Sequence, residues 1–212
     1  MKFSERASLP TRFGKFRVQA VQEAPGGKDH LVILHGEGEG KRDIPVRIHS
    51  ECLTGDVMGS LRCDCRDQLE RALHLIQEDD AGLLIYLRQE GRGIGLMNKI
   101  QAYFLQERGY DTVEANHRLG FENDLRNYDL AVQILRALDV KSVALITNNP
   151  EKIESLERGG IPVTRRIPLV ITPNRFNEEY LKTKQSKLGH LFHEESFEED
   201  VPGGAPQERR KP

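Results

Sequence analysis

The sequence contains no tryptophan and only three cysteines in 212 residues, and none of its apolar runs approaches the length of a membrane span. Three cysteines are too few, and odd in number, for a disulfide framework. The first residues, MKFSERASLPTRFGKF, lack the apolar core and small-residue cleavage site of a secretory signal. These absences predict a cytoplasmic protein with reduced cysteines and no membrane partner.

Neither positive nor negative charge dominates the chain. It carries 31 lysines and arginines against 33 aspartates and glutamates, for a formal net charge of -2. Such a balance provides no global attraction to nucleic acid or anionic lipid, so we expect neither as a partner. With 37% hydrophobic and 30% charged residues, the composition is that of a globular protein long enough to bury one core.

The apolar pattern predicts strands first and an alternation of strands and helices afterwards. Short apolar runs and alternation predict strands over residues 13–22, 31–37, 44–48, 82–87, 142–146 and 161–171. Helical periodicity predicts helices over residues 64–78, 96–108, 129–138, 150–158 and 177–188. This order indicates an α/β fold with N-terminal antiparallel strands, in which a mixed β-sheet is flanked by helices in three layers.

The two ends of the chain differ from this pattern. Residues 194–212, EESFEEDVPGGAPQERRKP, are charged and rich in proline and glycine, with almost nothing to bury. The first ten residues look loose for similar reasons. The sequence therefore predicts one folded domain over residues 1–193 and a disordered tail over residues 194–212.

All three cysteines lie within fourteen positions, in the spacing C-x10-C-x-C formed by Cys52, Cys63 and Cys65. Clustered thiolates suit zinc, which favours soft sulfur ligands. Structural zinc sites are normally closed by four protein ligands, whereas catalytic sites have three and a water. Three interpretations are open at this point: buried reduced cysteines, a structural site closed by the nearby His49, or an open catalytic zinc site.

Further segments contain residues suited to binding an anionic ligand. QEGRGIGL (residues 89–96) follows a predicted strand, and its glycines allow backbone N–H groups to face an anion. Arg92 favours a phosphate contact there, although the bare pattern is also that of an ordinary strand–helix turn. TNNPEK places Lys152 in the first turn of a helix after a strand, where α/β proteins bind ligands. ENDLRNYD places Asp124 two residues before Arg126, a spacing that by itself is typical of a surface ion pair.

Four segments together resemble the signature blocks of GTP cyclohydrolase II, the first enzyme of riboflavin synthesis. They are RIHSECLTGDVMGSLRCDCRDQL, QEGRGIGL, DTVEANHRLGFENDLRNY and TNNPEKI, and they occur in order within residues 11–187. The resemblance implies a zinc-dependent hydrolase that converts GTP to 2,5-diamino-6-(5-phosphoribosylamino)pyrimidin-4(3H)-one, formate and pyrophosphate. It also implies a homodimer and one zinc ion per subunit. Because a triphosphate substrate normally arrives with Mg2+, we expect Mg2+ with the GTP triphosphate.

The resemblance also implies a role for each reacting residue. The three cysteines would hold zinc, whose bound water attacks carbon 8 of the purine, and Tyr103 would lie near this chemistry. Arg126 would be the nucleophile on the α-phosphate, with Asp124 as the base that activates it. Because a guanidinium is almost never deprotonated, an alternative role for Arg126 is to stabilise charge on the transferring phosphoryl group.

For substrate binding, the resemblance points to twelve positions. They are Arg47, Ile48, His49, Ser50, Glu51, Gln68, Glu90, Gly91, Arg92, Thr112, Thr147 and Lys152. By residue type, Arg47, Arg92 and Lys152 suit a triphosphate, and Gln68 suits the edge of guanine.

Two competing interpretations stay open. One is a related cyclohydrolase that opens the ring or cleaves the phosphate but does not complete both steps. The other is a non-catalytic binding module stabilised by zinc. We expect a stand-alone domain rather than a fusion with a second flavin-pathway enzyme, because 212 residues leave no room for another domain.

Overall fold

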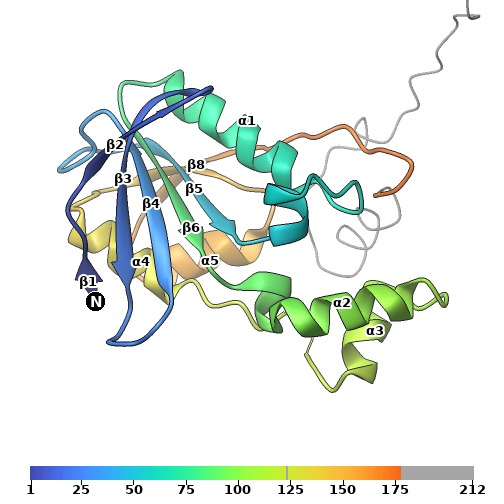
Figure 1. Cartoon of the computed structure of the whole chain (residues 1–212). Coiled ribbons are helices and arrows are strands. Elements are labelled where there is room, and N and C mark those ends of the chain that lie inside the picture. The colour runs from blue at the N-terminus through green and yellow to red at the C-terminus, as the bar shows by residue number, and fades with distance from the viewer. Residues whose placement is uncertain (123, 178–212) are drawn as a thin grey trace, which may run out of the picture.

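The computed structural model describes residues 1–122 and 124–177, and one mixed β-sheet of eight strands lies at their centre (Figure 1). The strands are β1 (Lys2–Phe3), β2 (Ala7–Thr11), β3 (Gly14–Gln22), β4 (Asp29–His35), β5 (Ile44–Ser50), β6 (Gly82–Leu87), β7 (Val143–Ile146) and β8 (Val163–Ile167). In space they follow the order β1-β3-β4-β6-β5-β7-β8, and β2 pairs with β3 outside this path. The predicted mixed sheet is confirmed.

Antiparallel and parallel pairings occupy opposite halves of the sheet. β3 pairs antiparallel with β1, β2 and β4, and β4 pairs antiparallel with β6. β5 pairs parallel with both β6 and β7, and β7 pairs parallel with β8. Because parallel neighbours end at the same edge of a sheet, the segments that follow β5, β6 and β7 converge there.

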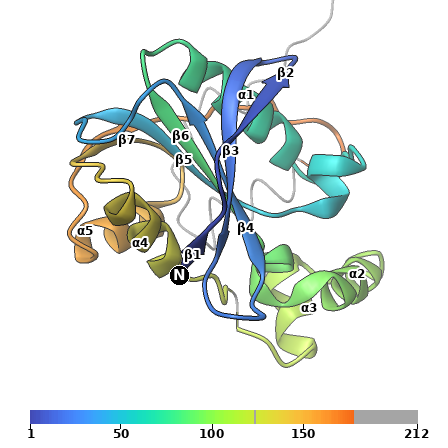
Figure 2. The same ribbon diagram turned by 60° about the vertical axis from the view of Figure 1, so that its left-hand side comes forward.

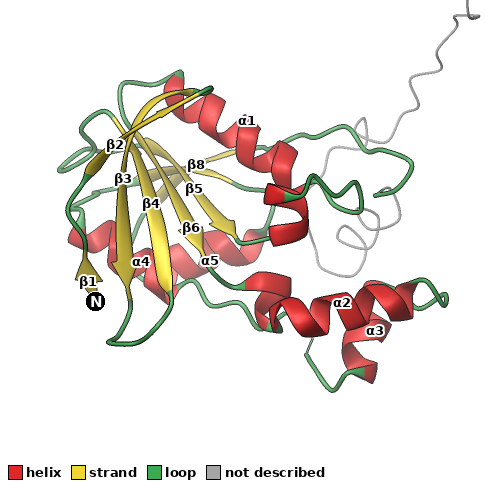
Figure 3. Ribbon diagram, viewed as in Figure 1, coloured by secondary structure: helices red, strands yellow, loops and turns green. Residues whose placement is uncertain are grey.

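Helices cover both faces of the sheet, as the predicted three layers require (Figure 3). α1 (Cys65–Gln77) lies on one face, and α4 (Asp129–Ala137) and α5 (Pro150–Arg158) lie on the other. α2 (Gly95–Gln106) and α3 (Thr112–Arg118) stand beyond the carboxyl edge of the sheet (Figures 1 and 2). These two helices therefore flank the place where the parallel strands end.

Two apolar clusters fill the spaces between the layers. The smaller lies between α1 and the sheet and contains Phe16, Ala72, Leu73, Ile76, Leu84, Ile146 and Leu169. The larger lies between the sheet and the other two helices, and Ile48, Leu135 and Leu145 are fully buried in it. Full burial of such a side chain contributes about 1.5–3 kcal/mol, so these clusters hold the strand ends in fixed positions.

The amino-terminal end differs from the prediction. The first ten residues, which look loose in sequence, contain β1 and most of β2. Both strands pair with β3, for example Lys2 with Gln22 and Ala7 with Val18. The prediction was wrong because this order comes from pairing with a later strand and leaves no local apolar signal.

The remaining elements agree with the prediction to different degrees. The bounds predicted for β6 and α5 are confirmed, whereas the strand predicted over residues 161–171 is limited to β8. α3 was not predicted; it begins with a capping box formed by Asp111 and Glu114. The helix predicted over 177–188, apart from Asn177, and the predicted tail over 194–212 lie outside the described residues. No helix in the described ranges combines the length and the apolar character needed to cross a bilayer.

Candidate active site

A cavity of about 730 Å³ opens at the edge where the parallel strands end. Its lining comes from the end of β5, from the segments after β5, β6 and β7, and from α1, α2, α3 and α5. α/β proteins usually bind ligands in the crevice beyond the carboxyl ends of their strands. Position and volume together make this cavity the candidate ligand site.

The three cysteines meet at this cavity. Their sulfur atoms lie within 4.8 Å of one another, and the Sγ atoms of Cys52 and Cys63 are 3.7 Å apart. A short π-helical turn, η1 (Leu53–Val57), follows Cys52, and α1 begins at Cys65. Gly55 permits the close approach, because a Cβ atom there would lie 2.7 Å from the Cys63 sulfur and 3.1 Å from the Cys52 sulfur.

This arrangement fits a soft metal ion with three protein ligands. Thiolate sulfur is a preferred donor for zinc, and three protein ligands leave one position of a tetrahedral site open. Within the described residues, the group of mutually close ligand atoms contains the three cysteines and no histidine or carboxylate. Nε2 of His49 lies instead 3.1 Å from Oδ1 of Asp56. This geometry does not support a site closed by His49.

A buried ion pair borders the cysteine cluster. Nζ of Lys99 lies 3.2 Å from the sulfur of Cys52 and 2.7 Å from Oε1 of Glu90. Burial alone lowers the pKa of Lys99, but Glu90 and Cys52 raise it overall, so the amine is a cation. Hydrogen bonds from Cys63 and Cys65, together with the charge of Lys99, lower the pKa of Cys52. The surroundings therefore favour a thiolate at Cys52.

Tyr103 lies one helical turn after Lys99, on the same face of α2. Its hydroxyl oxygen is 3.3 Å from Oγ1 of Thr54, and that oxygen is 3.8 Å from the sulfur of Cys52. The guanidinium of Arg62 lies over the Tyr103 ring, 4.5 Å from its centroid. Burial raises the pKa of Tyr103, so the phenol keeps its proton at neutral pH and can donate a hydrogen bond.

Asp56 connects η1 to two strands of the sheet. Its Oδ2 accepts the backbone N–H of Cys52 at 2.9 Å and the hydroxyl of Tyr86 at 2.8 Å. The ring of His49 stacks on Tyr86, with centroids 5.4 Å apart, and its Nε2 faces the same carboxylate. Burial lowers the pKa of His49 although Asp56 opposes this effect. Asp56 thus orients both the ring of His49 and the start of η1.

Arg47 is held in the cavity lining by two acceptors, one of which belongs to a short hydrogen-bond network. Its guanidinium donates to the carbonyl oxygen of Ile146 at 3.0 Å and to Oε1 of Gln68 at 2.6 Å. The amide nitrogen of Gln68 donates in turn to Asp64. Burial lowers the pKa of Arg47 to about 10, which keeps it charged at neutral pH. Because both ends of its amide are engaged, Gln68 acts in this structure to position Arg47.

The segment after β7 leads to another buried basic residue, Lys152. The side chain of Asn149 caps α5 by accepting the N–H of Glu151 at 3.0 Å, and Thr147 Oγ1 accepts the N–H of Asn149 at 3.0 Å. Lys152, in the first turn of α5, is buried and donates to the carbonyl oxygen of Ile48 at 2.7 Å. The side chain of Ile48 lies in the core, so this residue faces the site through its backbone.

The glycine-rich segment packs against the segment that carries Arg126. In η2 (Glu90–Gly93), Arg92 has a φ of 59°, a conformation that costs a non-glycine residue about 1 kcal/mol. The carbonyl oxygen of Arg92 accepts the N–H of Leu125 at 3.0 Å. Nε of Arg126 donates to Oδ1 of Asp124 at 2.9 Å. Burial raises the pKa of Asp124, but the hydrogen bond and charge of Arg126 outweigh this effect. The net pKa is lowered, so the carboxylate is charged.

Comparison with known proteins identifies the family of the chain. The family model described as GTP cyclohydrolase II matches residues 2–168. The chain belongs to the GTP cyclohydrolase II family. It is therefore a member of a family of enzymes, which argues against the non-catalytic binding module.

Similar proteins support this assignment. GTP cyclohydrolase-2 of Picrophilus torridus is 55% identical over 91% of this chain and 100% of that protein. GTP cyclohydrolase-2 of Campylobacter hominis is 53% identical over 91% of this chain and 96% of that protein. The riboflavin biosynthesis protein RibBA of Bacillus subtilis is 54% identical over 88% of this chain, which corresponds to 47% of that protein.

Most of the site residues predicted from the sequence line the cavity. They are Arg47, His49, Ser50, Glu51, Cys52, Cys63, Cys65, Gln68, Glu90, Gly91, Arg92, Tyr103, Thr112, Arg126, Thr147 and Lys152. The lining contains neither Ile48 nor Asp124. The carbonyl oxygen of Ile48 accepts from Lys152, and Asp124 accepts from Arg126, which does line the cavity.

Two charged residues beside the cysteines were missed by sequence reasoning. Lys99 had a weak signal, since it lies four residues before Tyr103 on a predicted helix. Asp56 lies in the loop after Cys52, and its contact with Tyr86 of β6 leaves no local pattern. Both depend on contacts between distant segments: Lys99 and Cys52 are 47 positions apart in sequence.

Proposed function

We propose that this chain is a zinc-dependent hydrolase that converts GTP to 2,5-diamino-6-(5-phosphoribosylamino)pyrimidin-4(3H)-one, formate and pyrophosphate. This reaction is the first step of riboflavin biosynthesis. One observation carries the proposal: a single cavity brings a cluster of three cysteines together with the cations Arg47, Arg92, Arg126 and Lys152. The reaction needs both a hydrolytic centre for the purine ring and positive charge for the triphosphate, and this cavity contains both.

Cys52, Cys63 and Cys65 would hold one zinc ion per subunit. Zinc bound there would supply Lewis-acid chemistry for the hydrolytic opening of the five-membered ring of the purine. The fit rests on the donor set, three sulfur atoms within 4.8 Å of one another, and on the space that Gly55 leaves beside them.

Tyr103 would hold a proton beside the ring-opening chemistry. Its phenol is protonated at neutral pH because burial raises its pKa, and it reaches the cysteine cluster through Thr54. A protonated phenol at this position can donate a hydrogen bond to charge that develops on the purine as its ring opens.

The cations would bind the triphosphate and support release of pyrophosphate. Lys152 and Arg47 are buried, and their positions are set by contacts with Ile48 and Gln68. Arg126 would stabilise charge on the transferring phosphoryl group, because its guanidinium is held as a cation by Asp124. We expect Mg2+ to accompany the triphosphate, as is usual for nucleotide substrates. A homodimer and a cytoplasmic location stay predictions.

The test is incubation of the purified protein with GTP, Mg2+ and zinc, with products identified by mass spectrometry. We expect formate, pyrophosphate and the diaminopyrimidine monophosphate in equal amounts. A product that keeps its formyl group would instead indicate the truncated reaction. Unchanged GTP, in the presence of folded protein with one bound zinc, would contradict the proposal and favour a binding function.

A pair of variants tests whether the activity depends on the cysteine cluster. Cys63→Ser is expected to abolish zinc binding and turnover, because it removes one of three sulfur ligands. Ser60→Ala, a change in the same loop at a residue outside the cavity lining, serves as the control and should keep both.

A further inference from the structure

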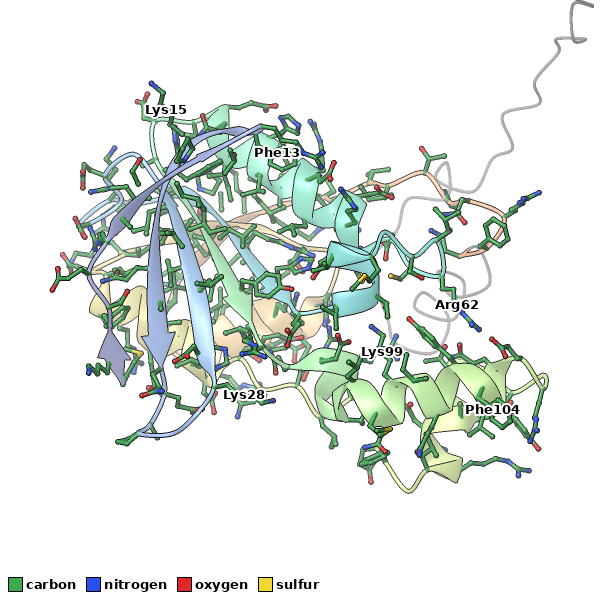
Figure 4. The ribbon with its side chains drawn as sticks, in the orientation of Figure 1. Phe13, Lys15, Lys28, Arg62, Lys99 and Phe104 are labelled. Atoms are coloured by element: carbon green, nitrogen blue, oxygen red, sulfur yellow. The ribbon has the colours of Figure 1, made fainter. Side chains whose placement is uncertain are left out.

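The sulfur of Cys52 has a charged neighbour that is not a thiol. The ammonium of Lys99 donates to this sulfur at 3.2 Å, and the hydroxyl of Thr54 lies at 3.8 Å. Lys99 reaches this position from α2 across the cavity, and Figure 4 shows its side chain pointing from that helix toward the segment that carries the cysteines. A charged hydrogen bond to sulfur is therefore built between two separate parts of the fold.

Glu90 fixes the ammonium of Lys99. Its Oε1 accepts from Lys99 at 2.7 Å and from the N–H of Gly91 at 2.8 Å, while Oε2 accepts from the N–H of Leu53 at 2.6 Å. The side chains of Lys99 and Glu90 are only 11% and 10% exposed. An ion pair this buried gains little net stability over apolar residues of similar size, so its presence suggests a role at the site.

The charges explain what that role is. Three thiolates and one divalent cation sum to -1, so the sulfur atoms donate much charge to the metal and weaken it as a Lewis acid. A hydrogen bond from a cation to one thiolate draws electron density away from that sulfur. Hydrogen bonds to metal-bound sulfur are a known means by which proteins tune such centres.

We propose that Lys99 is a positioning residue of the cysteine centre, acting through Cys52. Its ammonium holds the Cys52 thiolate in place and reduces the charge that this sulfur donates, and Glu90 holds the ammonium in position. The inference rests on the proposed metal at the three cysteines. It assigns to Glu90 a role besides the contact with substrate expected from the sequence.

The test replaces zinc with Co2+, whose charge-transfer bands report the electron donation of each sulfur. In Lys99→Met the sulfur of Cys52 loses its donor, so we expect the sulfur-to-cobalt bands to move to longer wavelength. With zinc bound, kcat should fall about 10- to 100-fold, the usual effect of losing a group that supports a metal ligand. KM for GTP should stay within about twofold, because Lys99 acts on the metal centre.

Three further variants keep the test decisive. Lys99→Arg retains a cationic donor and should recover most of the band position and of kcat. Lys15→Met is the matched control, since Lys15 is an exposed residue of β3 and lies far from the cysteines (Figure 4). If Lys99→Met does not fold, Lys99→Gln provides a neutral donor, and a smaller shift in the same direction is expected.

The outcomes separate this inference from the proposed function. A wild-type protein without sulfur-to-cobalt bands would overturn the metal assignment itself. Wild-type bands that stay unchanged in Lys99→Met would overturn the role of Lys99 alone. Unchanged bands together with a large rise in KM would assign Lys99 to substrate binding instead.

Discussion

Arg126 and Asp124 form a largely buried ion pair between residues only two positions apart. Nε of Arg126 lies 2.9 Å from Oδ1 and 3.0 Å from Oδ2 of Asp124, and the backbone N–H of Arg126 lies 3.0 Å from Oδ1. The side chains of Arg126 and Asp124 are 13% and 19% exposed. A carboxylate in this position stabilises the protonated guanidinium, which opposes a role for Arg126 as a nucleophile.

The first prediction concerns this pair. Arg126→Ala should lower pyrophosphate release about 100-fold or more, since it removes positive charge from the transferring phosphoryl group. Arg126→Lys should retain more activity than Arg126→Ala because it keeps the charge. Intact-mass spectrometry of wild-type protein quenched during turnover should show no covalent nucleotide. A guanylylated protein whose adduct disappears in Arg126→Ala would establish the nucleophilic role instead.

The second prediction concerns Gly55. In Gly55→Ala the new methyl group meets the sulfur atoms of Cys63 and Cys52, so we expect zinc affinity to fall about 10-fold or more. Gly26→Ala is the control, because a Cβ atom there meets nothing within 4 Å although its φ is 77°. The control should lose about 1 kcal/mol of stability and keep wild-type zinc affinity. Equal zinc affinity in the two variants would count against the packing argument.

The third prediction compares the partly buried Tyr86 with the buried Tyr128. The hydroxyl of Tyr86 donates to Asp56 at 2.8 Å, so Tyr86→Phe should lower the free energy of unfolding by about 1–3 kcal/mol. The hydroxyl of Tyr128 is buried and has no hydrogen-bond partner among the described residues. Tyr128→Phe should therefore be neutral or stabilising. Urea unfolding of the two variants measures the difference, and equal losses would contradict the hydrogen-bond assignment.

The fourth prediction concerns His30 and pH. Nδ1 of His30 accepts the N–H of Arg88 at 3.0 Å, and burial lowers the pKa of His30 from its ordinary value of about 6.5. Glu23 opposes this shift, while Lys28 and Arg88 add to it. The unfolded chain therefore binds the proton more readily. The contribution of neutral His30 to the free energy of unfolding is fully present above about pH 6.5. It is lost as the pH falls toward the pKa of His30 in the folded protein.

Unfolding in urea at about pH 7.5 and about pH 5.5 tests this prediction. Wild-type protein should lose more stability on acidification than His30→Gln, which cannot take up this proton. His117→Gln, at an exposed position of α3, is the control and should follow the wild type. A His30→Gln variant with the full wild-type loss would show that other groups cause the pH dependence.

The sequence was sufficient for features that depend on neighbouring residues. Apolar runs and helix signals predicted β6 and α5 with the bounds that the structure has, because burial on both faces and a proline at the first helical turn leave local patterns. The order of strands and helices also indicated a mixed sheet covered on both faces. The spacing of Cys52, Cys63 and Cys65 identified a candidate metal site without any structure.

Tertiary structure decided which distant residues share the site. Lys99 belongs to it because a helix beyond the sheet brings its ammonium to Cys52, and Asp56 is held beside the site by Tyr86 of β6. β1 and β2 are ordered because they pair with β3, although their own residues show no apolar pattern. Secondary-structure propensity and motif spacing depend on residues that are close in sequence, so the sequence alone predicts them. Charge networks and strand pairing arise only when separate segments fold against one another.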